Sequence, residues 1–454
     1  MDLQGKKLLL ISANRYVNPY PVYPLGLSYL TTYLRERIPS LEIRIFDFNL
    51  DSPEDFTKEL LSFKPDYTAL SLRNIDDVNF YSKESFINGY YAIIALIRET
   101  LSVPLIIGGS GFSIYPRELF SLFKPDFGIQ GEGEESLFRL LVSLDQGKPD
   151  YTIEGLIYAS DDKIITNPRK HFIHKPSLEL DQKLIPFYWD KAGMVNIQTK
   201  RGCPYNCIYC TYPLIEGHKV RNLDIDKIIH TLTVLYYNHQ VDYLFFTDSV
   251  FNIDNQYNQE LAIKMIDAKL PIHWGAYFSP HNLTLDELDL YARAGLTHIE
   301  FGTESLSDST LKHYSKHFTV EDVVRVSNLC NQVKIYFCHF MIIGGYGESE
   351  ATVNESFENS KRIENTVFFP YIGMRIYPGT GLQQQAIREG IIDADDQLLE
   401  PVYYIAPDIR YDTLKERAQQ TGRRWVFPNE DVATIMNKMR KRKRKGSLWH
   451  HLKK

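Results

Sequence analysis

Three cysteines in one short loop are the residues of this sequence whose types and spacing point most directly to chemistry. The segment GCPYNCIYC places Cys203, Cys207 and Cys210 in a CxxxCxxC spacing directly after a predicted strand. Three thiolates can hold three irons of a cubane cluster and leave the fourth iron open to a substrate or cofactor. The alternative is a zinc site, but zinc normally needs a fourth Cys or His at matching spacing, and Cys330 and Cys338 are far away in the sequence.

Composition limits the class of protein that carries this loop. The chain has 454 residues and is 44% hydrophobic, which suits two or three domains with substantial cores. Five cysteines, three of them between 203 and 210, do not resemble a disulfide framework, and no run of about 18 uncharged apolar residues occurs. We therefore expect a cytoplasmic protein in a reducing compartment. The formal charge of -6 gives no general reason to expect nucleic acid, although the tail 438–454 is basic.

The elements before the cysteine loop follow the rhythm of a parallel α/β sheet. Short apolar runs alternate with segments of helical spacing, and these runs lie at 6–12, 41–48, 67–72, 103–108 and 126–130. We expect a Rossmann-like first domain over 1–150. A hairpin-like stretch and a Pro-containing linker follow over 151–190.

The alternation of strands and helices starts again near residue 194. Six such units over about two hundred residues predict a partial (β/α)6 barrel of the TIM type over 191–385 rather than a second open sheet. Residues 386–454 form a C-terminal extension that is expected to end in an amphipathic, basic helix. The predicted fold class is α/β throughout, with a helical extension.

The cysteine loop resembles the signature of the radical S-adenosylmethionine (SAM) superfamily, including an aromatic residue, Tyr209, just before the last cysteine. This resemblance implies a [4Fe-4S] cluster on Cys203, Cys207 and Cys210. It also implies that the amino and carboxylate groups of SAM chelate the open iron, and that reductive cleavage of SAM gives a 5′-deoxyadenosyl radical. Such a radical needs a site that excludes water, as the inside of a barrel does.

Four later segments resemble that family's barrel strands in order: FFTDSVFN, FGTES, MIIGGYGES and GMRIYPGTGL. The resemblance implies SAM contacts at Tyr209, Asp248, Glu304, the glycine pair Gly344 and Gly345, and Arg375. Asp248 and Glu304 have an alternative reading, because acidic residues at strand ends often cap the following helix.

The first domain contains two Gly-rich loops after predicted strands, within 106–141. Glycines at the carboxyl ends of parallel strands let a ligand approach the backbone closely. Together with YPLGLSYL and FDFNL, this segment resembles the cobalamin-binding domain that precedes many radical SAM barrels. The cobalamin contacts that we expect are Arg73, Asn74, Gly108, Gly109, Ser110, Gly131, Glu132 and Gly133.

One motif of cobalamin proteins is absent. The DxHxxG segment, which supplies a histidine to the lower face of cobalt in many of them, is replaced by SANRYVNPYPVYPLG. The lower face would then be water-filled, empty, or approached by Arg73, Asn74 or Tyr16. Two alternatives remain open: the run SLRNIDDVN is an ordinary surface loop, or the domain keeps its fold and has lost cobalamin.

The two resemblances together imply a class B type radical SAM methylase or cyclase. Methyl transfer from methylcobalamin to an unactivated carbon is the first choice, and a cyclase or ring-rearranging enzyme is the alternative. The segment EGIIDADDQLLEPVYYIAP and the tail KGSLWHHL resemble a lipid-associated branch. Methylthiotransfer would need a second cluster, but no cysteine precedes Cys203, and a non-catalytic cobalamin sensor would need no open-iron motif.

The expected partners follow from the same reading. They are a small-molecule substrate, which includes a lipid or another natural-product intermediate, and an external one-electron reductant of the flavodoxin or ferredoxin type. The basic tail is either a solvated helix face or a contact with phosphate or an anionic membrane surface. No nucleic-acid partner is expected.

Overall fold

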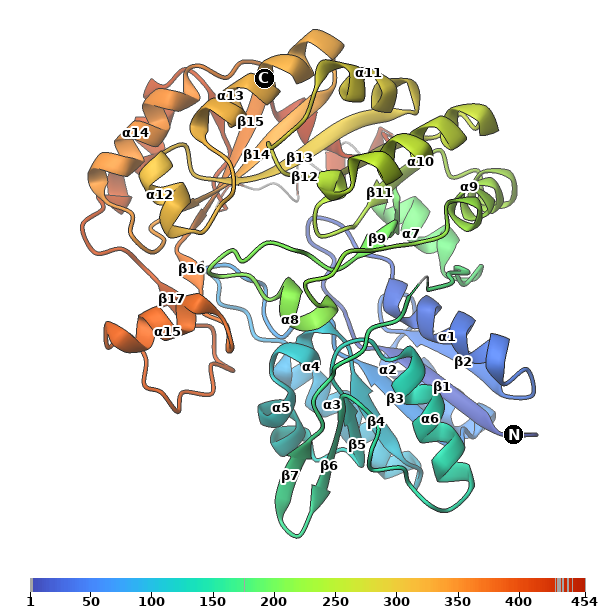
Figure 1. The fold of residues 1–454 in the computed structure, drawn as a ribbon. Helices are drawn as coiled ribbons and strands as arrows, with labels where there is room; N and C mark the ends of the chain where they lie inside the picture. Colours follow the sequence, from blue (N-terminus) through green and yellow to red (C-terminus); the bar gives the residue numbers. More distant parts are fainter. Residues whose placement is uncertain are drawn as a thin grey trace.

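The chain folds into two α/β domains that lie one above the other (Figure 1). The computed structural model describes residues 3–174, 176–428, 430, 434, 437–438, 441–442 and 444–453. The first domain forms the lower half of Figure 1, and an extended segment leads from it into the upper domain.

The first domain is built on a sheet with the strand order β2-β1-β3-β4-β5-β6-β7. Strands β1 to β5 run parallel, whereas β6 and β7 form an antiparallel hairpin at the edge. The direction of winding changes between β1 and β3, and ligands of such sheets bind beyond the carboxyl ends of the strands near this point. The strands are β1 (Lys7–Ser12), β2 (Glu42–Asp47), β3 (Tyr67–Ser71), β4 (Leu105–Gly108), β5 (Phe127–Ile129), β6 (Leu156–Ser160) and β7 (Lys163–Thr166).

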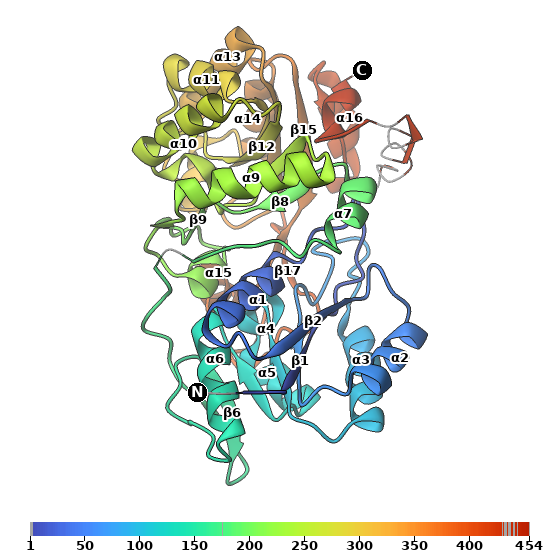
Figure 2. The same cartoon turned by 90° about the vertical axis from the view of Figure 1, so that its right-hand side faces the viewer.

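Helices cover both faces of this sheet (Figure 2). Strand β1 shows why, because its apolar residues are continuous and its side chains alternate between the faces. Leu8 and Leu10 pack in one cluster with residues of α1 and α6, whereas Leu9 and Ile11 pack in another with residues of α2, α3 and α5. The helices are α1 (Leu25–Arg37), α2 (Pro53–Phe63), α3 (Ile87–Thr100), α4 (Ser110–Ile114), α5 (Pro116–Phe123) and α6 (Glu134–Asp145).

The second domain is an open, barrel-like sheet of parallel strands in the order β18-β15-β14-β13-β12-β11-β8. The predicted partial (β/α)6 barrel is therefore confirmed. Its strands are β8 (Val195–Ile197), β11 (Tyr243–Phe246), β12 (His273–Phe278), β13 (Leu296–Glu304), β14 (Tyr336–Ile343), β15 (Thr366–Ile372) and β18 (Arg424–Trp425).

Helices cover the outer face of the barrel, and the alternation along β13 separates outside from inside. Ile299 and Phe301 pack with Leu288, Tyr291 and Val323 of the covering helices in the main core cluster. Two of these helices begin at capping boxes, Thr284 with Glu287 and Thr319 with Asp322. The helices are α7 (Ile185–Ala192), α9 (Ile225–His239), α10 (Asn255–Ala268), α11 (Leu285–Arg293), α12 (Asp308–His313), α13 (Val320–Val333), α14 (Glu350–Ser360) and α16 (Leu414–Gln420).

Several short elements complete the chain. The hairpin of β9 (Lys200–Arg201) and β10 (Arg221–Asn222) encloses α8 (Tyr212–Glu216), and the pair β16 (Met374–Arg375) and β17 (Tyr403–Tyr404) encloses α15 (Gly381–Arg388). Three 3-10 turns are assigned within the described residues: η1 (Phe251–Ile253), η2 (Tyr411–Thr413) and η3 (Leu448–Lys453).

The structure extends both sheets beyond the limits expected from the sequence. Strands β6 and β7 of the expected linker join the first sheet, so that sheet continues past residue 150. In the expected C-terminal extension, β18 joins the barrel sheet and η3 packs against β14 and β15. The basic helix that we predicted there lies partly outside the described residues, and its expected last turns are instead the non-helical segment 444–447 and the 3-10 helix η3.

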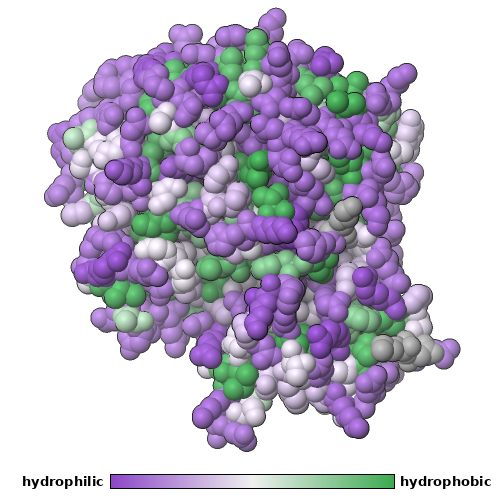
Figure 3. All heavy atoms as spheres, viewed as in Figure 1, coloured by the Kyte–Doolittle hydropathy of each residue, from purple (hydrophilic) through white to green (hydrophobic). Residues whose placement is uncertain are grey.

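The surface is mostly hydrophilic on the face shown in Figure 3, and apolar residues reach it in separate small patches over both domains and between them. Among the helices that the structure describes, none has both the length and the apolar composition needed to cross a bilayer.

Candidate functional site

The three motif cysteines lie in the loop between β9 and α8, on the side of the barrel that faces the first domain (Figure 1). Backbone hydrogen bonds hold this loop in shape. The Cys210 N–H donates to the Cys207 carbonyl at 3.1 Å, and the Cys203 N–H donates to the Gly217 carbonyl at 3.0 Å. The segment that carries the three cysteines is therefore a compact loop, held by these two backbone hydrogen bonds.

The surroundings of these thiols fit an iron–sulfur cluster. Burial raises the pKa of Cys203, and it raises the pKa of Cys210 to about 12, so bound iron must replace these protons. The charge of Cys207 contributes to both shifts, which means that the three sulfurs are within electrostatic reach of one another. No three His, Cys, Asp or Glu side chains of the described residues surround a single-ion site. Three thiolates from one loop suit a cubane, because each thiolate binds a separate iron.

Asp248 positions the strand that leads into the cysteine loop. Its carboxylate accepts hydrogen bonds from the Thr199 N–H at 2.6 Å, the Lys200 N–H at 3.1 Å and the Lys200 ammonium at 2.8 Å, and from the Thr199 hydroxyl. Asp248 and Lys200 are both 0% exposed. Both carboxylate oxygens thus accept hydrogen bonds from the protein, and the predicted SAM contact of Asp248 stays a prediction.

Glu304 lies at the end of β13, next to the cysteine loop. Its Oε1 accepts hydrogen bonds from the Tyr209 hydroxyl at 2.8 Å and from the Lys316 ammonium at 3.3 Å. Burial lowers the pKa of Lys316, but the charges of Glu304 and Cys207 outweigh it and raise that pKa above its ordinary value. Glu304 itself adopts φ +65°, a left-handed conformation that is uncommon outside glycine and is often found at functional sites.

The capping alternative for the two acidic residues is wrong. The helix after β11 begins at its N-cap Asp254, and the helix after β13 follows the N-cap Ser307. Neither Asp248 nor Glu304 is therefore the cap. Asp248 instead bonds the strand before the cysteine loop, and Glu304 bonds Tyr209 within that loop.

The glycine pair after β14 is held by tightly packed tyrosines. A Cβ at Gly344 would lie 2.2 Å from the Tyr411 hydroxyl, and a Cβ at Gly345 would lie 2.2 Å from the Tyr314 hydroxyl. The Gly344 N–H donates to the carboxyl of Glu348, whose pKa is raised to about 8 by burial. This turn needs glycine for packing, and its predicted contact with SAM stays a prediction.

Arg375 joins the two domains. Its guanidinium forms an ion pair with Asp76 of the first domain, with 3.1 Å between Nε and Oδ2, and donates to the Tyr115 hydroxyl at 3.0 Å. Further bonds run to the Ile376 and Leu398 carbonyls. These partners occupy the guanidinium, and the predicted contact of Arg375 with a SAM carboxylate stays a prediction.

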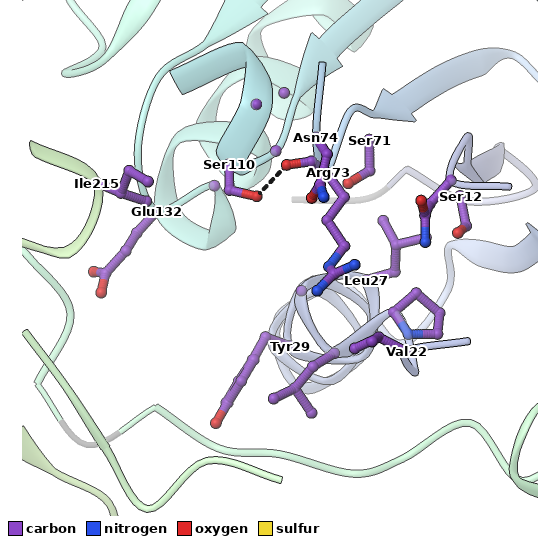
Figure 4. Close-up of a pocket in the computed structure, with 18 of the residues that line it drawn as sticks. Ser12, Val22, Leu27, Tyr29, Ser71, Arg73, Asn74, Ser110, Glu132 and Ile215 are labelled. Atoms are coloured by element: carbon purple, nitrogen blue, oxygen red, sulfur yellow. Dashed lines mark hydrogen bonds between the residues drawn. The ribbon is translucent and has the colours of Figure 1, made fainter. Parts of the chain in front are cut away.

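A cavity of about 550 Å³ opens beyond the carboxyl ends of β1, β3, β4 and β5. Figure 4 shows the side chain of Arg73 reaching across it toward α1, with the Ser110 hydroxyl bonded to the Arg73 carbonyl at 2.8 Å. Gly109 has φ +98°, and a Cβ there would lie 2.6 Å from the Leu72 carbonyl oxygen, so this loop requires glycine. The cavity lining includes all of the predicted cobalamin contacts: Arg73, Asn74, Gly108, Gly109, Ser110, Gly131, Glu132 and Gly133.

The barrel supplies the opposite wall of the same cavity. Thr211 and Tyr212, which directly follow Cys210, line it. Further lining residues come from the inner ends of barrel strands, namely Asn196, Gln198, Phe245, Thr247 and Tyr277. One continuous space therefore joins the glycine loops of the first domain to the neighbourhood of the cysteine loop.

A buried charge network borders this cavity between the domains. Arg201 of β9 pairs with Glu132 at 3.2 Å and with Glu134 at 2.8 Å, and Arg221 pairs with Glu132 at 2.6 Å. These four side chains are at most 6% exposed. Glu132 thus anchors the second glycine loop to the strand that precedes the cysteines.

Comparison with known families agrees with this geometry. The family model described as "Radical SAM superfamily" matches residues 197–359, and the model described as "B12 binding domain" matches residues 13–141. The chain is a cobalamin-dependent radical SAM enzyme. Its cofactors are accordingly a [4Fe-4S] cluster, SAM and cobalamin.

Curated relatives of this radical SAM enzyme include several methyltransferases. It is 24% identical over 387 residues to an uncharacterized methyltransferase of Pyrococcus horikoshii, a match that covers 81% of this chain and 79% of the relative. It is 22% identical to the tryptophan 2-C-methyltransferase of Streptomyces laurentii, with 84% and 74% covered. An anaerobic magnesium-protoporphyrin IX monomethyl ester cyclase of Rubrivivax gelatinosus is 25% identical, with 56% and 48% covered.

A solved structure shares the whole fold of this enzyme. The radical SAM methyltransferase TsrM from Kitasatospora setae, with cobalamin and a [4Fe-4S] cluster bound, superposes with a TM-score of 0.85 at 20% identity. The match covers 100% of this chain and 98% of TsrM. This likeness shows a shared arrangement of both domains.

Several site residues were missed in the sequence. Lys200, Arg201 and Lys316 are charged and buried near the cysteines, yet each would be read as an ordinary surface residue. A charged residue within an apolar strand, as in the run NIQTKR before the motif, is the signal that could have indicated the first two. Lys316 follows a helix, and the sequence gives no sign of its pairing with Glu304.

Proposed function

We propose that this enzyme is a methyltransferase that transfers a methyl group to an unactivated carbon of a small molecule. The single observation that supports this most is the shared cavity, whose lining combines the glycine loops of the first domain with Thr211 and Tyr212 beside the cysteine loop. A substrate held there would lie between both cofactors, and such positioning accounts for much of the effect of a catalytic site.

The residues of the chain would divide the work as follows. Cys203, Cys207 and Cys210 would hold the cluster, and Glu304 with Tyr209 would contact SAM near the barrel mouth. The glycine-loop residues that line the cavity would hold cobalamin, with Arg73 and Asn74 on its walls available to the lower face of cobalt. When bound, these cofactors supply a 5′-deoxyadenosyl radical and a transferable methyl group. Tyr16 does not line the cavity.

Anaerobic reconstitution with iron, sulfide and hydroxocobalamin tests this proposal. The loaded enzyme is desalted, and its iron, sulfide and corrin contents are measured. It is then incubated with SAM, titanium(III) citrate and pools of candidate small molecules. A methyltransferase should form S-adenosylhomocysteine together with 5′-deoxyadenosine and a methylated product. Iron without corrin would overturn the cobalamin part of the proposal.

One variant separates the two cofactors. Ser110→Phe fills the cavity beside the Arg73 carbonyl, where the serine hydroxyl now bonds. We expect loss of corrin and of S-adenosylhomocysteine, while iron content stays at the wild-type level. Ser62→Phe, an exposed position on α2, is the matched control.

A cyclase or ring-rearranging enzyme is the second candidate, because relatives named as cyclases match about half of the chain. Such a reaction would consume SAM to give 5′-deoxyadenosine and methionine without S-adenosylhomocysteine. The same assay therefore distinguishes the two reactions.

The partners are proposed with the reaction. A flavodoxin or ferredoxin would supply the electron in the cell, and a lipid or another natural-product intermediate would be the substrate. The enzyme would work in the cytoplasm, and its basic tail would contact a membrane surface peripherally. Replacing titanium(III) citrate with reduced flavodoxin in the assay tests the proposed reductant. Co-sedimentation with anionic vesicles tests the membrane contact of the tail.

A further inference from the structure

A buried acid lies inside the barrel, below the residues assigned to SAM. Along β13 the side chains of Ile299 and Phe301 face the outer helices, so Glu300 between them faces the inside of the barrel, on the N-terminal side of the irregularity that precedes Glu304. The register places Glu300 beside Tyr277 of β12 and Cys338 of β14. Glu300 is 4% exposed.

This carboxyl has few partners for its burial. The Trp449 indole N–H donates to Oε1 at 3.0 Å, and within the described part of the chain it is the one hydrogen-bond donor to Glu300. No Lys or Arg of those residues forms an ion pair with it. A buried carboxylate normally needs several donors or a cation, and burial here raises its pKa to about 7.

Trp449 reaches Glu300 from the C-terminal segment. That segment packs under β14 and β15, where Trp449 and Leu452 form a cluster with Cys338 and Val367. The indole therefore closes the lower side of Glu300. The other carboxylate oxygen, Oε2, accepts no hydrogen bond from the described residues.

Aromatic side chains surround the space above Glu300. Tyr277 is 37% exposed and Tyr371 is 44% exposed, although both project from central barrel strands on the inner face. Tyr20, from the loop after β1 of the first domain, and Tyr277 line the shared cavity. Desolvation of the phenols inside the barrel raises the pKa of Tyr20, Tyr277 and Tyr371, and in each the charge of Glu300 is the next contribution, which agrees with their lying around this carboxyl.

We propose that Glu300 anchors a protonated nitrogen of the substrate, whose apolar body lies among Tyr20, Tyr277 and Tyr371. The proposal rests on the proposed function, because it assumes that the substrate occupies the shared cavity. A carboxylate together with electron-rich rings favours the binding of a cation. The ring faces attract the cation, and the carboxylate forms an ion pair with it. An anionic group would instead be repelled by the same carboxylate. Glu300 is thus a specificity-determining residue.

The test measures binding separately from catalysis. The enzyme is loaded with iron, sulfide, hydroxocobalamin and SAM, and the binding of radiolabelled phenethylamine and of 3-phenylpropionate is measured by equilibrium dialysis. Wild-type enzyme should bind phenethylamine more tightly than 3-phenylpropionate. Glu300→Gln should weaken phenethylamine binding by about tenfold or more while SAM and corrin contents stay unchanged.

The control is Glu287→Gln, which changes a buried carboxyl at the start of α11, on the outside of the barrel. It should bind phenethylamine as the wild type does. Equal affinity of the wild type and Glu300→Gln for phenethylamine, no phenethylamine binding to the wild type, or a preference for 3-phenylpropionate would each overturn the proposal. Failure of the proposed function is distinguishable, because it would appear as absent corrin or absent SAM cleavage in the wild type.

Discussion

Arg375 of the barrel and Asp76 of the first domain form an ion pair across the domain interface, with 3.1 Å between Nε and Oδ2 and both side chains 1% exposed. The two residues are 299 positions apart in the sequence. Their pairing fixes the end of β15 and the short β16 against the loop after β3, which lines the shared cavity.

Breaking this pair should destabilise the protein strongly. Asp76→Asn leaves the buried guanidinium without a counter-charge, and such changes cost about 3–5 kcal/mol. Arg375→Met should cost a similar amount, and the double variant should recover part of the loss. Urea unfolding of all four proteins measures this. Asp289→Asn, which removes an exposed partner of Arg293, is the control, and losses below about 1 kcal/mol for Asp76→Asn would contradict the prediction.

Replacing any motif cysteine with Ala should abolish cluster binding. Cys203→Ala, Cys207→Ala and Cys210→Ala should each lose the cluster and all cleavage of SAM, measured as iron and sulfide content and as 5′-deoxyadenosine. Cys330→Ala is the matched control, because this thiol is 0% exposed in the core of α13 and the barrel. An intact, active cluster in any of the three variants would refute the central assignment.

Glu304→Ala should weaken SAM binding and leave the iron content nearly intact. The variant removes the acceptor of the Tyr209 hydroxyl and the counter-charge of Lys316, without touching a cysteine. Equilibrium dialysis with labelled SAM gives the affinity, and we expect a loss of about tenfold or more. Glu321→Ala, at an exposed position at the start of α13, is the control. Unchanged SAM affinity would leave Glu304 with a purely structural role.

The stability of the protein should depend on pH through Glu348. Burial raises its pKa to about 8, from an ordinary value of 4.5. The folded state therefore holds this proton more tightly, so the group stabilises the fold below about pH 4.5, and this stabilisation is lost as the pH rises toward 8. Relative to Glu348→Gln, the wild-type free energy of unfolding should fall by a few kcal/mol, or about 1.4 kcal/mol per pKa unit, across that range. Urea unfolding at several pH values measures the difference, and parallel curves for the two proteins would contradict it.

The sequence was sufficient for the parts of the site that depend on local patterns. The spacing of Cys203, Cys207 and Cys210 and the glycines after β4 and β5 are such patterns, since each is fixed by the covalent and conformational needs of one loop. The alternation of apolar strands and amphipathic helices likewise predicted both domains. It did not predict which strands form the edges of their sheets. Strands β6 and β18 are short additions whose pairing depends on a distant partner.

The contacts that could not be predicted are those whose partners are distant in the sequence. Nothing near Arg375 in the sequence indicates its partner Asp76, which belongs to the other domain. Asp248 is bonded to Thr199 and Lys200, which precede it by 48 or more positions. Trp449 reaches Glu300 across 149 positions. Local spacing carries no information on such pairs, because tertiary packing alone brings them together.

The buried network of Glu132 with Arg201 and Arg221 bears on attempts to recombine these enzymes. A chimaera that joins this cobalamin domain to the barrel of a relative would keep one set of charges and exchange the other. Unless the relative carries the matching arginines, the graft would bury uncompensated carboxylates beside the cavity. Exchange of domains to alter substrate range therefore has to move Glu132, Arg201 and Arg221 as one unit.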